Sequence, residues 1–207
     1  MTNRIGFMQG RLSPIVDNKI QSFPWGNWKN EIVEAKQNGL SLMEWTLDQV
    51  NLNENPLMMH QGKVEIIKLC DQLDFSIPSL TGDCFMQAPF WKAVNVSEQT
   101  QLEKTFLEIA EACSAVGIKK IVVPLVDNGS IQQPEQESVL VDFCTINEVH
   151  FRKLGLKIVF ESDFPPTKLK KLMDRLESNT FGINYDIGNS AALGFKPEDE
   201  FLEIGNR

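Results

Sequence analysis

Two kinds of hydrophobic pattern alternate along the chain. Short apolar runs rich in β-branched and aromatic residues predict buried strands, and longer segments with apolar residues every three to four positions predict helices. No turn signal joins two strands as a hairpin. The pattern therefore predicts an α/β fold with a parallel sheet and right-handed crossovers. The expected strands are 5–8, 40–45, 75–80, 118–125, 156–161 and 180–186.

The expected helices fill the intervals between these strands. A helix from about residue 28 ends at Asn38-Gly39, and helices at 97–116 and 134–154 end at Gly117 and Gly155. Further helices are expected before residue 74, at 167–176 and at 197–204. For three of these helices the spacing predicts burial of Val64, Ile67, Leu69 and Leu73; of Leu102, Phe106, Ile109, Ala110, Cys113 and Val116; and of Val139, Leu140, Phe143, Ile146 and Phe151.

A parallel sheet of this kind is either open and doubly wound or closed as a barrel. No Gly-x-Gly-x-x-Gly motif follows the first strand and no Walker loop is present, so the nucleotide-binding form of the open sheet lacks its fingerprint. A (β/α)8-type TIM barrel is favoured, although about six βα units are counted where eight close the ring. At 207 residues and 42% hydrophobic composition, residues 1–207 are expected to form a single barrel domain.

Carboxylates stand where two of the expected strands end. Glu161 ends the strand 156–161, and Asp186 ends the strand 180–186. Burying a neutral polar group without a hydrogen bond costs roughly 2–7 kcal/mol, and burying an unpaired carboxylate inside a strand costs more. At the end of a strand, by contrast, a carboxylate can face a ligand. In parallel α/β folds sites lie at the carboxyl ends of strands, so the two acids predict a shared site. The alternative interpretation is that both merely cap the following turns.

Composition narrows the partners and the compartment. A net charge of −8 argues against binding to nucleic acid, which requires a basic face. The four cysteines form no Cys-x-x-Cys pair, as expected of reduced core thiols. The N-terminus lacks an apolar signal segment, and no window reaches the roughly 18 apolar residues of a membrane span. These features predict a soluble, cytoplasmic protein that acts on small molecules and has no membrane partner.

Several of these segments resemble a known family. The chain is similar to the xylose isomerase-like TIM barrels of the sugar phosphate isomerase/epimerase superfamily, which includes tagatose 3-epimerase-like and pentulose-5-phosphate 3-epimerase-like enzymes. The similarity runs through 5–7, 38–44 and 77–79, and it is most specific at Phe160-Glu161 and at 185–189, Tyr-Asp-Ile-Gly-Asn.

The resemblance implies a function and roles for particular residues. It implies isomerisation or epimerisation of a sugar or sugar phosphate by proton transfer through a cis-enediolate. Glu161 would be a metal ligand and an acid/base, Asp186 would be a second ligand, and Mn²⁺ or Mg²⁺ would suit these oxygen donors. Asn189 stands where relatives place a His, as a candidate contact for substrate. Four residues are expected to bind substrate: Gln9, Arg11, Glu44 and Asn189. For Arg11 and Glu44 a solvated surface position is the equal alternative.

The resemblance also implies parts that this sequence does not show. A metal-binding His on strand seven and a second Glu on strand eight have no counterpart before Arg207. The sequence is interpreted either as a piece of a longer protein, which we favour, or as a shortened homologue. Six units would leave open strand edges, which a homo-oligomer would cover.

Two other functions remain open at this stage. One is a non-catalytic sugar-binding or scaffolding barrel. The other is a metal-dependent phosphodiesterase of the abasic-site endonuclease branch, against which two histidines and a negative net charge both count. The sugar itself, its phosphorylation and the choice between isomerisation and epimerisation are not determined by the sequence.

Overall fold

The strands form one parallel sheet in sequential order. The computed structural model describes residues 5–15 and 22–207, and within these ranges the order is β1-β2-β3-β4-β5-β6. A doubly wound sheet would reverse direction at a switch point, whereas sequential order is that of a barrel. The prediction of a TIM-barrel type α/β fold is confirmed. The strands are β1 (Phe7–Met8), β2 (Leu42–Thr46), β3 (Ser76–Thr81), β4 (Lys120–Leu125), β5 (Lys157–Ser162) and β6 (Phe181–Ile183).

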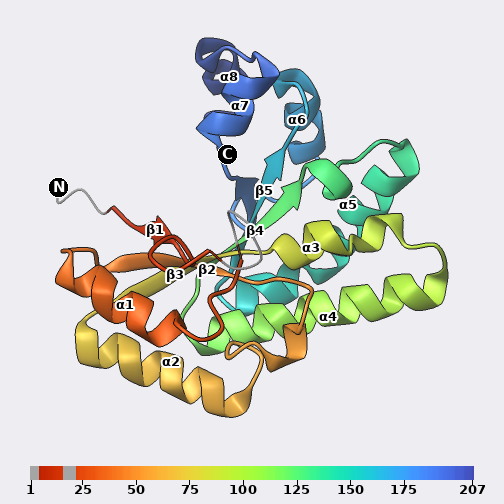
Figure 1. The fold of residues 1–207 in the computed structure, drawn as a ribbon. Coiled ribbons are helices and arrows are strands. Elements are labelled where there is room, and N and C mark those ends of the chain that lie inside the picture. The colour runs from red at the N-terminus through yellow and green to blue at the C-terminus, as the bar shows by residue number, and fades with distance from the viewer. Residues whose placement is uncertain (1–4, 16–21) are drawn as a thin grey trace.

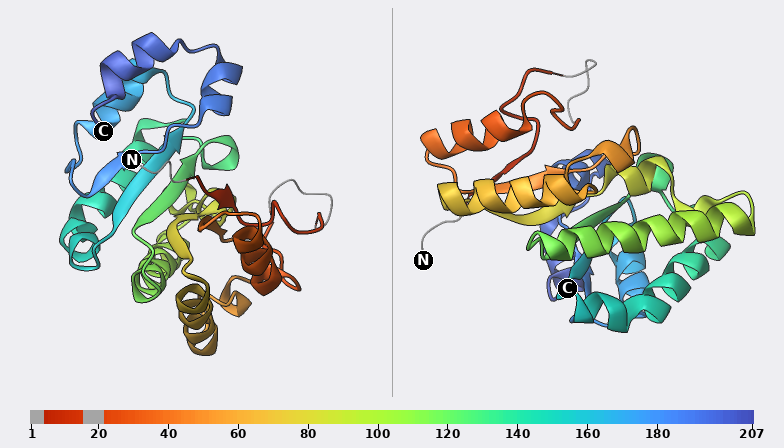
Figure 2. Two further views of the ribbon diagram at one scale, coloured as in Figure 1. Left: turned by 90° about the vertical axis from the view of Figure 1, so that its left-hand side faces the viewer. Right: turned by 90° about the horizontal axis from the view of Figure 1, so that it is seen from below.

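Helices surround the sheet on its outer side. Figures 1 and 2 show α1, α2, α4 and α5 arranged as an arc around the strands, while α6, α7 and α8 gather in one group beyond β5. Three short 3-10 turns, η1 (Leu52–Glu54), η2 (Phe90–Lys92) and η3 (Asp127–Gly129), lie in the connections. The helices are α1 (Trp28–Gln37), α2 (His60–Leu73), α3 (Asp83–Gln87), α4 (Val96–Ala115), α5 (Pro134–Lys153), α6 (Pro166–Met173), α7 (Ile187–Leu193) and α8 (Pro197–Ile204).

The two faces of the sheet carry different residues. Ile121 pairs with Ile158 and Val123 with Phe160, and all four are buried against the helices. The alternate positions pair Lys120 with Lys157 and Pro124 with Glu161, so Glu161 lies on the inner face. The helix-side core continues through aromatic contacts, with Phe106 5.1 Å from Phe143 and Phe151 6.2 Å from Phe181 between ring centroids. The fold thus directs Glu161 away from the apolar core.

The helix boundaries follow their sequence signals, and one pair illustrates the cause. Gly117 and Gly155 adopt φ angles of 87° and 68°, which L side chains disfavour, directly after α4 and α5. Each helix therefore stops there and the chain turns into β4 or β5. The long predicted face of α4 is confirmed, since Phe106, Ile109 and Cys113 are all buried.

Two predicted buried faces were partly wrong. On α2, Val64 and Ile67 are 47% and 40% exposed, whereas Ile66 is 1% exposed. Apolar residues lie almost all round this helix, so periodicity alone could not select the buried side. On α5, Ile146 is 78% exposed, while Val141 and Cys144 are buried in its place. The short helices α3 and α7 were not expected at all.

The thiols are reduced and mostly buried. Cys84, Cys113 and Cys144 are buried and Cys70 is half-buried, and all four are free. Burial raises the pKa of Cys70 to about 11. It also raises the pKa of the other three well above that of a free thiol. The expectation of core cysteines in reduced form agrees with this placement.

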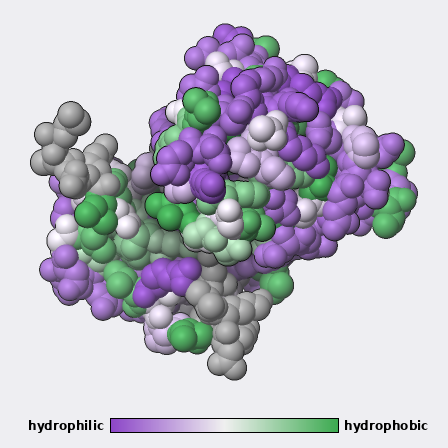
Figure 3. Space-filling view, turned by 90° about the horizontal axis from the view of Figure 1, so that it is seen from above, coloured by the Kyte–Doolittle hydropathy of each residue, from purple (hydrophilic) through white to green (hydrophobic). Residues whose placement is uncertain are grey.

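Across the described ranges, no helix combines the length and apolar character needed to cross a bilayer. Viewed from the side on which α6, α7 and α8 lie, the upper and right-hand surface is mostly hydrophilic, and apolar residues gather toward the centre and the left (Figure 3).

Candidate functional site

The ends of β5 and β6 bring the two predicted carboxylates to one edge of the sheet. Glu161 is the penultimate residue of β5, and Asp186 is the N-cap of α7, three residues after β6 ends. The backbone N–H of Asn184 donates to Phe160 O at 2.9 Å, which extends the pairing of the two strands past β6. Glu161 and the 184–186 segment are therefore held side by side.

Two asparagines bind Glu161, and one of them also binds Asp186. Asn184 Nδ2 donates to Glu161 Oε2 at 3.1 Å, and Asn189 Nδ2 donates to Glu161 Oε1 at 2.6 Å. Asn189 also donates its backbone N–H to Asp186 Oδ1 at 2.9 Å. One residue of α7 thus touches both acids. Asn189 was expected near substrate, whereas Asn184 was not singled out, because nothing in a single sequence distinguishes it from a loop asparagine.

The environment perturbs Glu161. Burial is the largest cause that raises the pKa of its carboxyl above the ordinary value, and the negative charge of Asp186 raises it further. The hydrogen bond from Asn184 lowers the pKa of Glu161, and the charge of Glu44 raises it. A carboxylate with a raised pKa is a stronger base than a free one, as a proton-abstracting group requires.

Glu44 faces the same interior from β2. Its carboxylate accepts a short hydrogen bond from the Thr81 hydroxyl on β3, and its charge acts on Glu161. Thr81 was not predicted, because its contact with Glu44 depends on the strand register, which pairs Glu44 with Ser79, two residues before Thr81. The inner face at this end therefore holds acids from β2 and β5.

The two candidates after β1 lie in contrasting environments. Gln9 is fully buried: its Oε1 accepts from the Thr46 backbone N–H at 3.1 Å, and its Nε2 is buried with no partner among the described residues. Arg11 is exposed in the following loop. That loop is anchored by Glu31, whose carboxylate accepts backbone N–H groups of Gly10 at 2.8 Å and Leu12 at 2.9 Å. Arg11 therefore lies between two residues, Gly10 and Leu12, whose backbone N–H groups are held by Glu31.

A third, buried acid, Glu200, lines the same small cavity as Glu161 and Asp186. Glu200 of α8 is 5% exposed and accepts hydrogen bonds from the Tyr185 hydroxyl at 2.8 Å and the Ser190 hydroxyl at 2.5 Å. The sequence showed it only as one of three consecutive acids, 198–200, which is the composition of a solvated helix start. Its burial depends on the packing of α8 against α6, and a linear pattern does not contain that information.

The acids do not form a complete metal centre by themselves. Within residues 5–15 and 22–207, no group of three or more His, Cys, Asp or Glu side chains is placed to hold a metal ion. Glu161, Asp186, Asn189 and Glu200 border a cavity of ≈ 20 Å³, which is the size of one water molecule. The two hard carboxylate donors fit a divalent cation as part of a ligand set.

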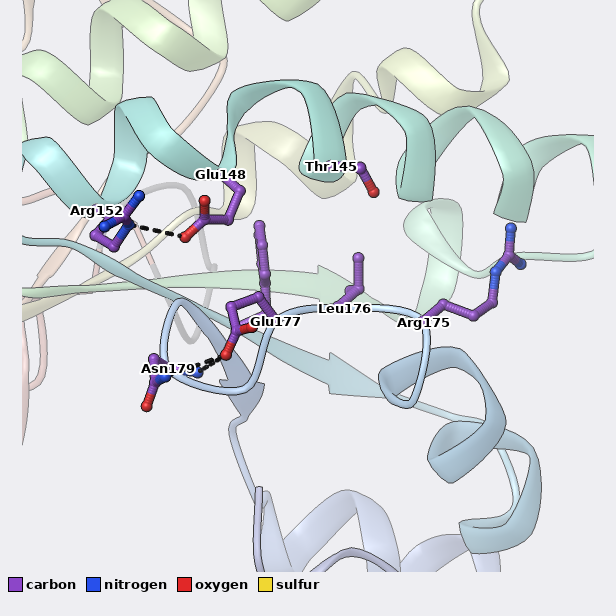
Figure 4. Close-up of a pocket in the computed structure, with 8 residues that line it drawn as sticks. Thr145, Glu148, Arg152, Arg175, Leu176, Glu177 and Asn179 are labelled. Atoms are coloured by element: carbon purple, nitrogen blue, oxygen red, sulfur yellow. Dashed lines mark hydrogen bonds and ion pairs between the residues drawn. The ribbon is translucent and has the colours of Figure 1, made fainter.

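A wider surface pocket lies at the opposite end of β6. It has a volume of ≈ 450 Å³ and lies between α5 and the loop before β6 (Figure 4). Both of its arginines are paired with acids: Arg152 Nε lies 3.2 Å from Glu148 Oε1 in the lining, and Arg175 Nη1 lies 2.7 Å from Oε1 of Glu137, elsewhere on α5. None of the predicted site residues lines this pocket.

Structural comparison identifies the fold. A 3-keto-D-glucoside 4-epimerase from E. coli, in its apo form, aligns with a TM-score of 0.70 and 12% identity over 98% of this chain and 75% of its own. A xylose isomerase-like TIM barrel protein from Mycobacterium smegmatis in complex with magnesium aligns with a TM-score of 0.68 and 11% identity, over 97% and 71% respectively.

The fold is that of the xylose isomerase-like TIM barrels. A sugar phosphate isomerase/epimerase from Parabacteroides distasonis has the same arrangement, with a TM-score of 0.68 and 11% identity over 98% of this chain and 72% of its own. The sequence itself matches no model of a known protein family and no curated protein. The resemblance seen in a few short motifs is thus confirmed as a xylose isomerase-like barrel in three dimensions, with six of the eight units of such a barrel in the described residues.

Proposed function

We propose that this protein is a divalent-metal-dependent isomerase or epimerase of a sugar or sugar phosphate. The observation that carries the proposal is the pair Glu161 and Asp186, joined by Asn189 at the carboxyl ends of two adjacent parallel strands. That end of the strands is where barrel enzymes hold their catalytic groups. The barrel fold shared with several sugar isomerases and epimerases supports the same class.

Glu161 is assigned the proton transfer. Its carboxylate would take a proton from the carbon next to the substrate carbonyl, and the electron pair of that C–H bond would move toward the carbonyl oxygen. Returning the proton to the former carbonyl carbon, while the hydroxyl proton of the adjacent carbon passes to the other oxygen, would give isomerisation. Epimerisation would take a proton on the opposite face of the same carbon from a second acid, which the resemblance places on strand eight. The raised pKa of Glu161 suits this role, because burial and Asp186 both strengthen its affinity for a proton.

Glu161 and Asp186 are also assigned as ligands of the cation. Their negative charges oppose each other, as the effect of Asp186 on Glu161 shows, and a bound cation would relieve this repulsion. When bound, Mn²⁺ or Mg²⁺ supplies positive charge that stabilises the negative charge developing on the substrate oxygen. Magnesium accompanies one barrel of this fold. The resemblance places two further ligands on strands seven and eight, so this pair is half of the expected set.

Substrate hydroxyl groups would meet the remaining polar side chains. Glu44 with Thr81, and the amide of Asn189, lie at the same end as Glu161. Gln9 has a buried Nε2 without a partner in the described part of the chain, and Arg11 occupies the loop beyond it. A second copy of the protein covering the open edges of β1 and β6 belongs to the same proposal.

Calorimetric titration with Mn²⁺ tests the metal assignment. We expect the unmodified chain to bind Mn²⁺, and the Glu161→Gln and Asp186→Asn variants each to lose at least tenfold in affinity, since each removes one charged ligand. Asp174→Asn, at the exposed C-cap position of α6, is the matched control and should bind as the unmodified chain does. A folded chain that binds no Mn²⁺, or variants that bind it equally well, would refute the assignment. A ketose and aldose panel then defines the substrate.

A further inference from the structure

A buried acid outside the proposed ligand pair has no role so far. Glu200 of α8 is 5% exposed, and its Oε2 accepts the hydroxyls of Tyr185 at 2.8 Å and Ser190 at 2.5 Å. A buried carboxylate is costly unless hydrogen bonds compensate it, so these two contacts are what makes its position tolerable. Both donors come from the segment that carries Asp186.

The contacts of Glu200 join three consecutive parts of the chain. Tyr185 lies in the connection after β6, between Asn184, which binds Glu161, and Asp186. Ser190 lies on α7, and its backbone N–H donates to Asp186 O at 3.0 Å. The Tyr185 ring also packs on Phe201 of α8, with centroids 5.2 Å apart. Glu200 thus holds the residues on both sides of Asp186.

We propose that Glu200 is a positioning residue for the metal-binding pair, acting through Tyr185 and Ser190 to fix Asp186 and Asn184 against Glu161. The inference rests on the proposed function. Its physical basis is the shortness of β6, which spans Phe181–Ile183. Among the described residues, the Asn184–Phe160 backbone bond alone continues the pairing with β5 beyond Ile183, so we infer that contacts from α8 help to fix the conformation of the 185–186 segment.

Mn²⁺ affinity measured by calorimetry distinguishes this role from a merely structural one. We expect Glu200→Ala to lose about tenfold in affinity, which is the scale for removing a group that orients a metal ligand. Glu200→Gln retains one acceptor oxygen, and because both hydroxyls donate to the single atom Oε2, that oxygen can keep both contacts and should restore most of that loss. Glu198→Ala, at an exposed position on the same helix, is the matched control and should bind normally.

Two milder variants keep the test valid if Glu200→Ala does not fold. Tyr185→Phe removes one hydroxyl and preserves the ring that packs on Phe201, and Ser190→Ala removes the other. Each should weaken Mn²⁺ binding by several-fold with circular dichroism unchanged. Equal affinity in both variants and in a folded Glu200→Ala would overturn the inference while leaving the proposed function intact.

Tyr185 supplies an independent signal, because it is the chain's single tyrosine. Protein labelled with ¹³C at tyrosine Cζ gives one resonance, which should move in Glu200→Ala without metal and broaden in the unmodified chain when paramagnetic Mn²⁺ binds nearby. A resonance that Glu200→Ala leaves in place would show that Glu200 does not hold Tyr185, which overturns the inference. If the unmodified chain binds no Mn²⁺, the proposed function fails and the inference fails with it.

Discussion

At the scale of single residues, the chemistry of the site depends on which neighbours each acid meets. Glu161 is bound by Asn184 and Asn189 and faces the charge of Asp186. Glu31 accepts the backbone N–H groups of Gly10 and Leu12 in the loop after β1 and also a side-chain hydrogen bond from Ser13. Burial raises the pKa of both. Glu31 holds the loop after β1 through these bonds, whereas Glu161 lies at the carboxyl end of β5 with a second acid beside it, an arrangement that is typical of functional sites.

This difference predicts that Glu161 lowers stability at neutral pH. Because its pKa is raised on folding, the folded state holds its proton more tightly, so its contribution to stability falls as pH rises through the raised pKa. In the presence of a chelator, Glu161→Gln should raise the melting temperature at pH 7 by about 2 °C. The difference should shrink as pH falls below the raised pKa of Glu161. A variant that melts lower at pH 7, or equally at every pH, contradicts this expectation.

Residue by residue, the sequence predicted the acids better than their partners. Glu161 and Asp186 could be placed together because parallel strands end at a common edge, which is a rule about topology. Asn184 and Glu200 could not be found, because their roles arise from contacts between β5, the β6–α7 connection and α8 that no spacing records. Arg11 and Gln9 remain predictions that binding experiments must test.

At the scale of elements, the apolar runs predicted the positions of the strands, but the spacing of apolar residues did not always predict which side of a helix is buried. All six predicted strands are present within the described ranges. The buried side of α2 was predicted wrongly because it depends on how closely the helix backbone packs against the preceding loop, which the spacing of apolar residues does not show. A Cβ on Gly62 would lie 2.1 Å from the Pro56 carbonyl oxygen, so α2 contacts the preceding loop directly at that position. The helix α7 escaped notice because it is short and contains Gly188 and Asn189, which are weak helix formers.

Gly62→Ala tests how α2 is seated. Helix propensity alone would favour alanine by about 1 kcal/mol, but the backbone of Pro56 cannot move aside as a flexible side chain would. We expect a net loss of about 2 kcal/mol in the free energy of unfolding, measured by urea denaturation. Gln61→Ala, at the neighbouring exposed position, is the control and should be neutral or slightly stabilising. A stabilised Gly62→Ala protein would show that α2 sits farther from the loop.

At the scale of the whole molecule, acids outnumber bases and meet at one end of an incomplete ring. The net charge is −8, and the inner face there carries Glu44 and Glu161 with Asp186 beside them. The sheet ends at β1 on one side and β6 on the other without mutual pairing in the described residues. A divalent cation bound by Glu161 and Asp186 would reduce the repulsion among these acids. It would also link the end of β5 to the start of α7.

Cation binding should accordingly stabilise the entire fold. At a Mn²⁺ concentration about 100 times its dissociation constant, binding to the folded state contributes roughly 2.7 kcal/mol. For a chain of this size that corresponds to a rise in melting temperature of about 5–10 °C, reversed by EDTA. Scanning fluorimetry with Mn²⁺, Mg²⁺ and Ca²⁺ measures it. The same rise in Asp186→Asn would place the ion elsewhere and count against the proposed pair.

Because the native thiols are mostly buried, a spin label can be attached selectively to an introduced cysteine. Cys113 and Cys144 lie in the helical core, and Cys70 holds its proton up to a pKa of about 11, so maleimide reagents at neutral pH meet almost no thiolate. A cysteine introduced on the exposed surface of α8 would then be the preferred point of attachment for a spin label. Distances from that label to Mn²⁺ could be followed without first deleting the native cysteines.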